Sequence, residues 1–270
     1  MRVKVIVADM DGTFLDNNSE YDRTRFMNQY CRMKEQGIRF VVASGNQYYQ
    51  LASFFPGIQD EIAFVAENGA LVIDSGKEIF HGELKDGSAK KINHILESYG
   101  DINFVVCGLK SAWVKKGVSE SFLQNMKKYY HRLKVVNSYD QIEDVIFKYA
   151  LSLDDKAIPA LLKDLSTQLE AIMTPVTSGH GSLDLIIPGI HKASGIQRLL
   201  SRWDVGREEV VAFGDSGNDI EMLTFAKYSF AMPNATEAVK RVSTYTTADN
   251  NNYGVLVMID EILAGNSPFQ

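Results

Sequence analysis

The chain has 270 residues, a mass of 30.2 kDa and a formal net charge of −6 at pH 7. An apolar share of 45% is typical of a globular protein with a sizeable core, and the acidic balance offers no basic surface, so we expect neither nucleic acid nor a membrane as a partner. No apolar run approaches the roughly 18 residues that a membrane helix needs, and no secretory signal pattern precedes the first apolar segment. We therefore expect a cytoplasmic protein whose two cysteines, Cys31 and Cys107, are reduced thiols.

Strands and helices alternate over the first 82 residues. The β-branched run at 3–8 predicts a strand buried on both faces of a parallel sheet. The next expected elements are a helix near 22–36, a strand at 38–43, a helix near 47–55 and a strand at 62–66. This alternation predicts a doubly wound sheet with right-handed crossovers, and two Gly-containing turns after it predict hairpin strands at 71–74 and 77–80.

The pattern changes between residues 83 and 184, where several expected strands are half polar. We predict that 83–184 is an inserted α+β domain with antiparallel strands and with its helices on one face. Its expected elements are a helix at 88–99, strands at 102–107 and 112–115, a helix at 119–131, a strand at 144–153, a helix at 156–170 and a strand at 172–176.

The alternating pattern then returns, which predicts that residues 1–82 and 185–270 form one discontinuous, Rossmann-like α/β domain. The expected elements of its second part are a strand at 183–187, a helix at 192–202, a strand at 209–214, a helix at 218–226, a strand at 228–231 and a helix near 255–263.

Two carboxylates follow the first strand directly. Asp9 and Asp11 are two positions apart, so an extended backbone sends both side chains to the same side, and Gly12-Thr13 supplies the turn. Asp often opens loops for structural reasons alone, but crowded carboxylates at a buried strand end repel one another. A bound divalent cation would remove that repulsion, so we predict a metal site.

Three distant segments add to this site. Ser44-Gly45 follows the second strand, where a hydroxyl and free amides suit phosphate binding. Lys192 opens a helix, a position that favours a lysine only when an anion is close by. Asp215, Asn218 and Asp219 lie in a Gly-rich loop after another apolar strand, and parallel strands bring such ends to one edge of a sheet.

Together these segments resemble the haloacid dehalogenase-like hydrolases, and within them the Cof-type phosphatases, which carry a large cap inserted after the first three strands. The resemblance covers the whole chain, and segments such as Glu67-Asn68-Gly69-Ala70 and 184–189 are similar to sugar phosphatases of that group. Many relatives have Thr-Gly-Arg at the second segment, whereas this chain has Ser44-Gly45-Asn46, so the contact that the arginine makes elsewhere is in question.

The resemblance implies a mechanism. Asp9 would be the nucleophile, and Asp11 would be the general acid and base. Mg²⁺ would be held by the carboxylates of Asp9 and Asp215 and by the backbone carbonyl of Asp11. Asp219 would orient Lys192 or a metal-bound water. The expected phosphate ligands are Ser44, the amides of Met10 and Gly45, Lys192 and Asn218.

We expect the substrate to be a small phosphorylated metabolite, most simply a hexose or pentose phosphate. Trp113, His180 and Asn68 are candidates for contacts with it. A phosphomutase or phosphotransferase with the same intermediate remains an alternative, as does a non-enzymatic phospho-acceptor domain, against which the acid at Asp11 and the inserted domain both argue. The sequence leaves the oligomeric state open.

Overall fold

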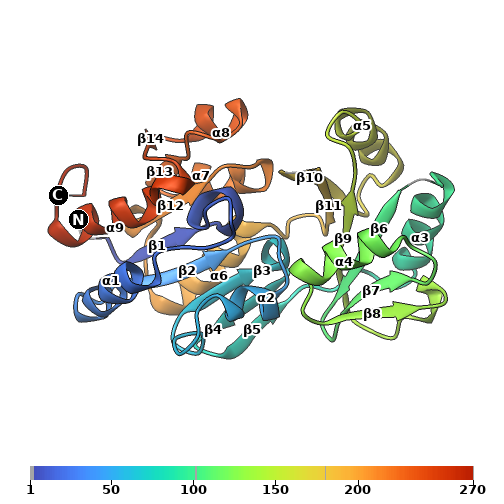
Figure 1. The fold of residues 1–270 in the computed structure, drawn as a ribbon, viewed down its shortest axis with the longest axis horizontal. Coiled ribbons are helices and arrows are strands. Elements are labelled where there is room, and N and C mark those ends of the chain that lie inside the picture. The colour runs from blue at the N-terminus through green and yellow to red at the C-terminus, as the bar shows by residue number, and fades with distance from the viewer. Residues whose placement is uncertain (1–2, 101, 180, 270) are drawn as a thin grey trace.

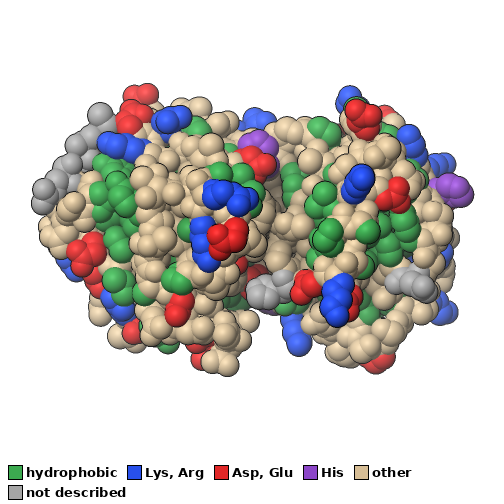
Figure 2. All heavy atoms as spheres, turned by 90° about the horizontal axis from the view of Figure 1, so that it is seen from above, with side chains coloured by type: hydrophobic (Ala, Val, Ile, Leu, Met, Phe, Trp, Pro, Cys, Tyr) green, Lys and Arg blue, Asp and Glu red, His purple; other side chains and the backbone are tan. Residues whose placement is uncertain are grey.

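The computed structural model describes residues 3–100, 102–179 and 181–269. These residues form two lobes, one that contains both ends of the chain and one built from its middle (Figure 1). A groove separates the two lobes on the face of the molecule that Figure 2 shows. Each lobe is built around its own β-sheet.

The first sheet has eight strands in the described part of the chain, in the order β14-β13-β12-β1-β2-β3-β4-β5. Pairing is parallel from β14 to β3 and antiparallel from β3 to β5. The strands are β1 (Val5–Ala8), β2 (Arg39–Ala43), β3 (Ala63–Ala66), β4 (Leu71–Asp74), β5 (Lys77–His81), β12 (Val210–Gly214), β13 (Tyr228–Ala231) and β14 (Tyr245–Thr246). The expected doubly wound α/β core is confirmed.

Successive residues of the central strands pack on opposite faces of this sheet. In β1, Ile6 and Ala8 join one core and Val5 and Val7 the other. The first core is covered by α1 (Arg23–Glu35), α2 (Tyr48–Ser53) and α9 (Gly254–Ala264), and the second by α6 (Lys192–Trp203), α7 (Ile220–Phe225) and α8 (Glu237–Val242). Because both faces are buried, the strands read as continuous apolar runs.

The second sheet has six strands among the described residues, in the order β10-β11-β9-β6-β7-β8. Its pairs are antiparallel except β7 with β8, which is parallel. The strands are β6 (Asn103–Gly108), β7 (Ala112–Lys115), β8 (Leu133–Val136), β9 (Ile146–Ser152), β10 (Thr174–Gly179) and β11 (Ser182–Ile186), and the helices are α3 (Ser88–Ser98), α4 (Glu120–Tyr129) and α5 (Ile158–Gln168).

The prediction that the helices of this lobe share one face is wrong. α3 and α5 cover one face, in a cluster that includes Leu183 and Leu185 of β11. α4 covers the other face, where Phe122 and Met126 pack against β6 and β7. The face that carries α4 is also the face to which Asp184 points, since neighbouring residues of a strand alternate.

The strand expected at 183–187 is present as β11, but its expected place is wrong. It pairs with β9 and β10 in the second sheet instead of resuming the first. The alternating pattern of the first lobe therefore returns only with α6. Two further strands, β8 and β14, and one further α-helix, α8, were not expected from the sequence.

Two smaller expectations concern the thiols and the membrane. Cys31 and Cys107 are both free, the first exposed and the second buried. Within the described residues, no helix combines the length and apolar character that crossing a bilayer requires.

Candidate active site

The register of the first sheet gathers the predicted residues at one edge. Ala8 of β1 pairs with Val42 of β2 on one side and with Phe213 of β12 on the other. The residues that follow these three positions therefore leave the sheet side by side, and the Asp9 amide donates to the carbonyl of Phe213 at 3.1 Å. Parallel strands that end together create a binding crevice at their carboxyl ends.

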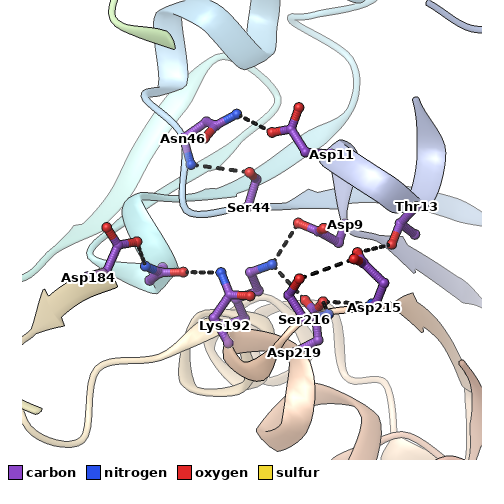
Figure 3. A network of polar contacts seen from close by, with 12 residues as sticks. Asp9, Asp11, Thr13, Ser44, Asn46, Asp184, Lys192, Asp215, Ser216 and Asp219 are labelled. Carbon is purple, nitrogen blue, oxygen red and sulfur yellow. Dashed lines mark hydrogen bonds and ion pairs between the residues drawn. The ribbon is translucent and has the colours of Figure 1, made fainter. Parts of the chain in front are cut away.

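Lys192 lies at the centre of the site (Figure 3). Its Nζ lies 2.6 Å from Asp9 Oδ1 and 2.6 Å from Asp219 Oδ1, and its side chain is fully buried. Burial alone would lower the pKa of Lys192, but the carboxylates of Asp219 and Asp9 outweigh it and raise that pKa. The first turn of α6 thus carries a permanent cation beside two carboxylates.

Both carboxylate oxygens of Asp219 accept hydrogen bonds within the site. Its second oxygen, Oδ2, accepts the backbone amides of Asp215 at 2.9 Å and of Ser216 at 3.0 Å. These bonds fix the carboxylate at the start of the loop after β12, while its other oxygen binds Lys192. Asp219 therefore acts as a support for Lys192.

Asp215 is held from both sides by hydroxyl groups. Thr13 Oγ1 donates to Asp215 Oδ1 at 2.8 Å, and Ser216 Oγ donates to Oδ2 at 3.1 Å. Gly12, at φ 73°, permits the close approach of the first turn, because a Cβ there would lie 2.8 Å from Asp215 Oδ2. The Gly-Thr turn is thus built around the Asp215 carboxylate.

These three carboxylates suit a divalent cation. Asp9, Asp215 and Asp219 are buried, and each offers an oxygen within 4.8 Å of the others. The described ion pairs of the group all go to Lys192, so one cation faces three carboxylates. Burial, and then the neighbouring Asp219 charge, raise the pKa of Asp215 to about 6, and burial raises the pKa of Asp9 against the opposing effect of Lys192. A hard divalent cation would offset this excess charge through the oxygen ligands that it prefers.

Asp11 points to the opposite side of the site, towards β2 (Figure 3). Asn46 Nδ2 donates to Asp11 Oδ2 at 2.7 Å, and the Asn46 amide donates to Ser44 Oγ at 3.1 Å. Asn46, which stands where many relatives have arginine, thus binds the expected acid and the expected phosphate ligand at once. The Asp11 side chain is absent from the carboxylate group that could hold a metal, and its expected metal contact was through the backbone carbonyl.

Of the remaining predicted residues, Met10, Gly45 and Asn218 lie around the same edge. Met10 begins the turn after β1 and is buried, and Gly45 follows Ser44. Asn218 Nδ2 donates to Asn68 Oδ1 at 2.9 Å, which brings Asn68 into the site. Trp113 is bound within the second lobe, where its Nε1 donates to Asp144 Oδ2 at 3.1 Å, and His180 lies outside the described residues.

Several residues of the site were not predicted from the sequence. Thr13 and Ser216 hold Asp215, and their place directly beside the acidic segments was a usable signal. Lys148 and Asp184 form a buried ion pair of 3.0 Å. A single charged residue inside the apolar strands β9 and β11 marked each of them in the sequence.

Comparison with known proteins gives one matching family model, haloacid dehalogenase-like hydrolase, over residues 6–259. The chain is 50% identical over 270 residues to the 5-amino-6-(5-phospho-D-ribitylamino)uracil phosphatase of Escherichia coli K12, with coverage of 100% of this chain and 99% of that protein. A Bacillus subtilis phosphatase named for the same compound is 27% identical, with coverage of 95% and 96%. A crystal structure of a Streptococcus mutans protein superposes with a TM-score of 0.93 at 37% identity, covering 97% of this chain and 99% of that one.

Proposed function

Because this chain belongs to the haloacid dehalogenase-like hydrolase family and is a phosphatase, we propose that it hydrolyses small phosphate monoesters through an aspartyl-phosphate on Asp9, with Mg²⁺ as cofactor. The observation that carries this proposal is the buried Lys192 ammonium held between Asp9 and Asp219 where the strand ends meet. A preorganised cation beside a carboxylate nucleophile stabilises the charge that develops on a transferring phosphoryl group.

The covalent step uses Asp9 and Asp11. Asp9 attacks phosphorus, the bond from phosphorus to the ester oxygen breaks, and Asp11 gives its proton to that oxygen. Asp11 then removes a proton from water, which attacks the acyl phosphate, releases inorganic phosphate and restores Asp9. The hydrogen bond from Asn46 holds Asp11 on the side of the site opposite Lys192, where a leaving group would depart.

The phosphoryl oxygens would be held by Ser44, Lys192 and the amides of Met10 and Gly45. The Ser44 oxygen accepts the Asn46 amide, which leaves the hydroxyl proton available to a phosphoryl oxygen. Asn218, buried beside Asn68, adds a further amide on the far side. Donors from three strand ends would therefore converge on one tetrahedral anion.

Asp9 and Asp215 are the residues that would hold Mg²⁺, together with the Asp11 carbonyl, since both oxygens of Asp219 are already bonded. When bound, Mg²⁺ supplies positive charge that lowers the repulsion between the nucleophile and the incoming phosphate. Asp219 instead keeps Lys192 charged and in place.

We propose two candidate classes of substrate and rank them. Relatives at 50% and 27% identity are named for 5-amino-6-(5-phospho-D-ribitylamino)uracil, and we place that ester first. Pentose and hexose phosphates come second. The ribityl ester is itself a phosphorylated five-carbon polyol, so the two classes share the chemistry next to phosphorus.

The test is phosphate release by the purified chain from the ribitylaminouracil ester, ribose 5-phosphate, glucose 6-phosphate and AMP, with Mg²⁺ or with EDTA. We expect Mg²⁺-dependent release, fastest with the ribityl ester. Release that EDTA leaves unchanged would contradict the metal proposal, and AMP as the best substrate would contradict the substrate proposal. Transfer of phosphate to an added sugar, in place of release, would favour the phosphotransferase alternative.

A further inference from the structure

A second polar cluster lies where the two lobes meet. We call it the junction cluster, and its members are buried polar residues that are linked by hydrogen bonds or, for Glu67, by an ion pair with Lys148: Glu67, Asn68, Lys148, Asp184 and Asn218. Lys148 Nζ and Asn68 Nδ2 lie 3.0 Å and 2.6 Å from the same oxygen, Asp184 Oδ2 (Figure 3 shows Asp184). Lys148 and Asp184 come from β9 and β11 of the second lobe, whereas the other three follow β3 and β12 of the first.

The cluster contains acceptors that the protein does not satisfy. Glu67 Oε2, Asp184 Oδ1 and Asn218 Oδ1 are buried atoms without a hydrogen-bond partner among the described residues. Their residues are only 2%, 2% and 6% exposed, and Lys148 Nζ is 3.7 Å from Glu67 Oε2, beyond hydrogen-bond reach. A buried acceptor without a donor costs about 1–3 kcal/mol, so donors that a ligand brings to this cluster would offset a cost that three acceptors share.

The cluster also adjoins the proposed phosphate position. A Cβ on Gly45 would lie 3.1 Å from Asp184 Oδ2 and 3.2 Å from Asn68 Oδ1, so the Gly45 backbone lies directly against both side chains. Asn218 belongs both to the proposed phosphate ligands and to the cluster. A group attached to a phosphate held at Gly45 and Asn218 would therefore begin beside Asp184.

We propose that the junction cluster is the leaving-group subsite, and that Glu67 and Asp184 accept hydrogen bonds from hydroxyl groups of the substrate. The proposal rests on the proposed function and adds the residues that select a hydroxylated leaving group. Lys148 and Asp184 come from the second lobe and Glu67 from the first, and Lys148 forms ion pairs with both carboxylates, so the subsite is complete only when the lobes are together. An ester without hydroxyl groups would bury the three acceptors unpaired.

The test compares two esters that differ only in hydroxyl groups: D-ribitol 5-phosphate and n-pentyl phosphate. We expect the wild type to prefer the ribitol ester in kcat/KM by at least about a hundredfold, since a site built for hydroxyl donors rejects analogues that lack them. Glu67→Gln and Asp184→Asn should each lower this preference at least tenfold, because an amide places a donor where the carboxylate offered an acceptor.

The matched control is Asp144→Asn. Asp144 is a carboxylate of the same lobe that accepts from Ser111 and Trp113 and lies outside the junction cluster, so the preference should stay at the wild-type value. Turnover of n-pentyl phosphate shows in each variant that the protein is folded, and a lowered preference in either junction variant alone is enough to support the subsite.

Three outcomes would overturn the proposal. If the preference for the ribitol ester is unchanged in both junction variants, Glu67 and Asp184 do not bind the hydroxyl groups of the leaving group. An equal loss on both esters shows that the cluster only holds the lobes together. Wild-type protein that releases phosphate from neither ester with Mg²⁺ refutes the proposed function itself, and this inference with it; turnover with an unchanged preference refutes the inference alone.

Discussion

Lys192 is the residue on which the charge balance of the site depends. It is fully buried and pairs with two buried carboxylates at 2.6 Å each. Removing one partner of a buried ion pair leaves an uncompensated charge in a low-dielectric environment, which costs more than the pair contributes. The same lysine should therefore matter for folding and for turnover.

We predict that Lys192→Met lowers the free energy of unfolding by about 3–5 kcal/mol and abolishes phosphate release. Denaturant unfolding in EDTA measures the first effect. Lys4→Met is the control, because Lys4 forms an ion pair of 2.9 Å with Glu209 while its side chain is 48% exposed, and its loss should cost at most about 1 kcal/mol. Equal stability of the two variants would show that the Lys192 pairs contribute little.

Glu67 predicts a pH dependence of stability. Burial, opposed by Lys148, raises the pKa of Glu67 from 4.5 to about 7 in the folded chain. The folded state therefore binds a proton that the unfolded state releases, so the stabilisation is complete below pH 4.5 and is lost as the pH rises through 7. Relative to Glu67→Gln, the wild type should lose about 3 kcal/mol between these pH values, measured by urea unfolding in EDTA. If the free energy of unfolding changed with pH in the same way in the wild type and in Glu67→Gln, the raised pKa of Glu67 would be contradicted.

At this scale the sequence predicted the residues whose placement follows from strand ends. Asp9, Ser44 and Asp215 each follow an apolar strand, so a parallel sheet must gather them. The partners of these residues were harder to predict. The hydrogen bond from Asn46 to Asp11 and the pairing of Lys148 with Asp184 depend on how separate segments pack, which no local pattern encodes.

Among the elements, the turn after β1 links backbone conformation to the metal site. Gly12 and Gly37 share a φ of 73°, but a Cβ on Gly12 would lie 2.8 Å from Asp215 Oδ2, whereas a Cβ on Gly37 would meet nothing within 4 Å. The two positions therefore carry the same backbone strain and differ only in the contact with Asp215. They form a matched pair.

We predict that Gly12→Ala weakens Mg²⁺ binding and that Gly37→Ala does not. Binding of an ion to the folded state raises the melting temperature by an amount that grows with its affinity. The rise in Tm on adding Mg²⁺ should be lost in Gly12→Ala and kept in Gly37→Ala, although both variants should be less stable than the wild type by at least about 1 kcal/mol because of their positive φ. An equal rise in Tm on adding Mg²⁺ in the two variants would show that the turn at Gly12 does not affect Mg²⁺ binding.

The elements also show where sequence patterns lose information. β8 has the sequence Leu133-Lys134-Val135-Val136, which was not predicted as a strand, and it pairs with β7 in the second sheet. β11 is rich in apolar residues like a strand of the first sheet, and its membership of the second is decided by long-range pairing with β9. The local sequence therefore predicts whether a segment is a strand better than it predicts which strand that segment pairs with.

For the whole molecule, we propose that the second lobe, residues 83–184 with the rest of β11, closes over the site as a cap. Contacts between the lobes support this. Gln47, after β2, accepts the Arg132 amide at 2.8 Å and donates to the Arg132 carbonyl at 3.1 Å. The Arg132 guanidinium lies 3.4 Å from the centre of the Tyr49 ring. These bonds fasten the end of α4 to the first lobe.

We predict that Gln47→Ala loosens this contact. Two lost hydrogen bonds of about 1 kcal/mol each would shift the closing equilibrium roughly 30-fold, so KM for a hydroxylated ester should rise and amide exchange at 128–136 should quicken. Gln124→Ala, on α4 but bonded only to Glu120 in the described contacts, is the control and should leave both unchanged. A normal KM in Gln47→Ala would mean that these bonds do not hold the cap.

The central claim is that catalysis proceeds through a phosphoryl group on Asp9. Asp11→Asn keeps the nucleophile but removes the base that activates water, so the intermediate should accumulate when the variant is mixed with Mg²⁺ and substrate. The measurement is intact-protein mass spectrometry followed by peptide mapping. We predict a gain of one phosphoryl group, located on Asp9 and absent from the double variant Asp9→Asn with Asp11→Asn. A variant that turns over substrate without any covalent adduct, or an adduct on another residue, would contradict the claim.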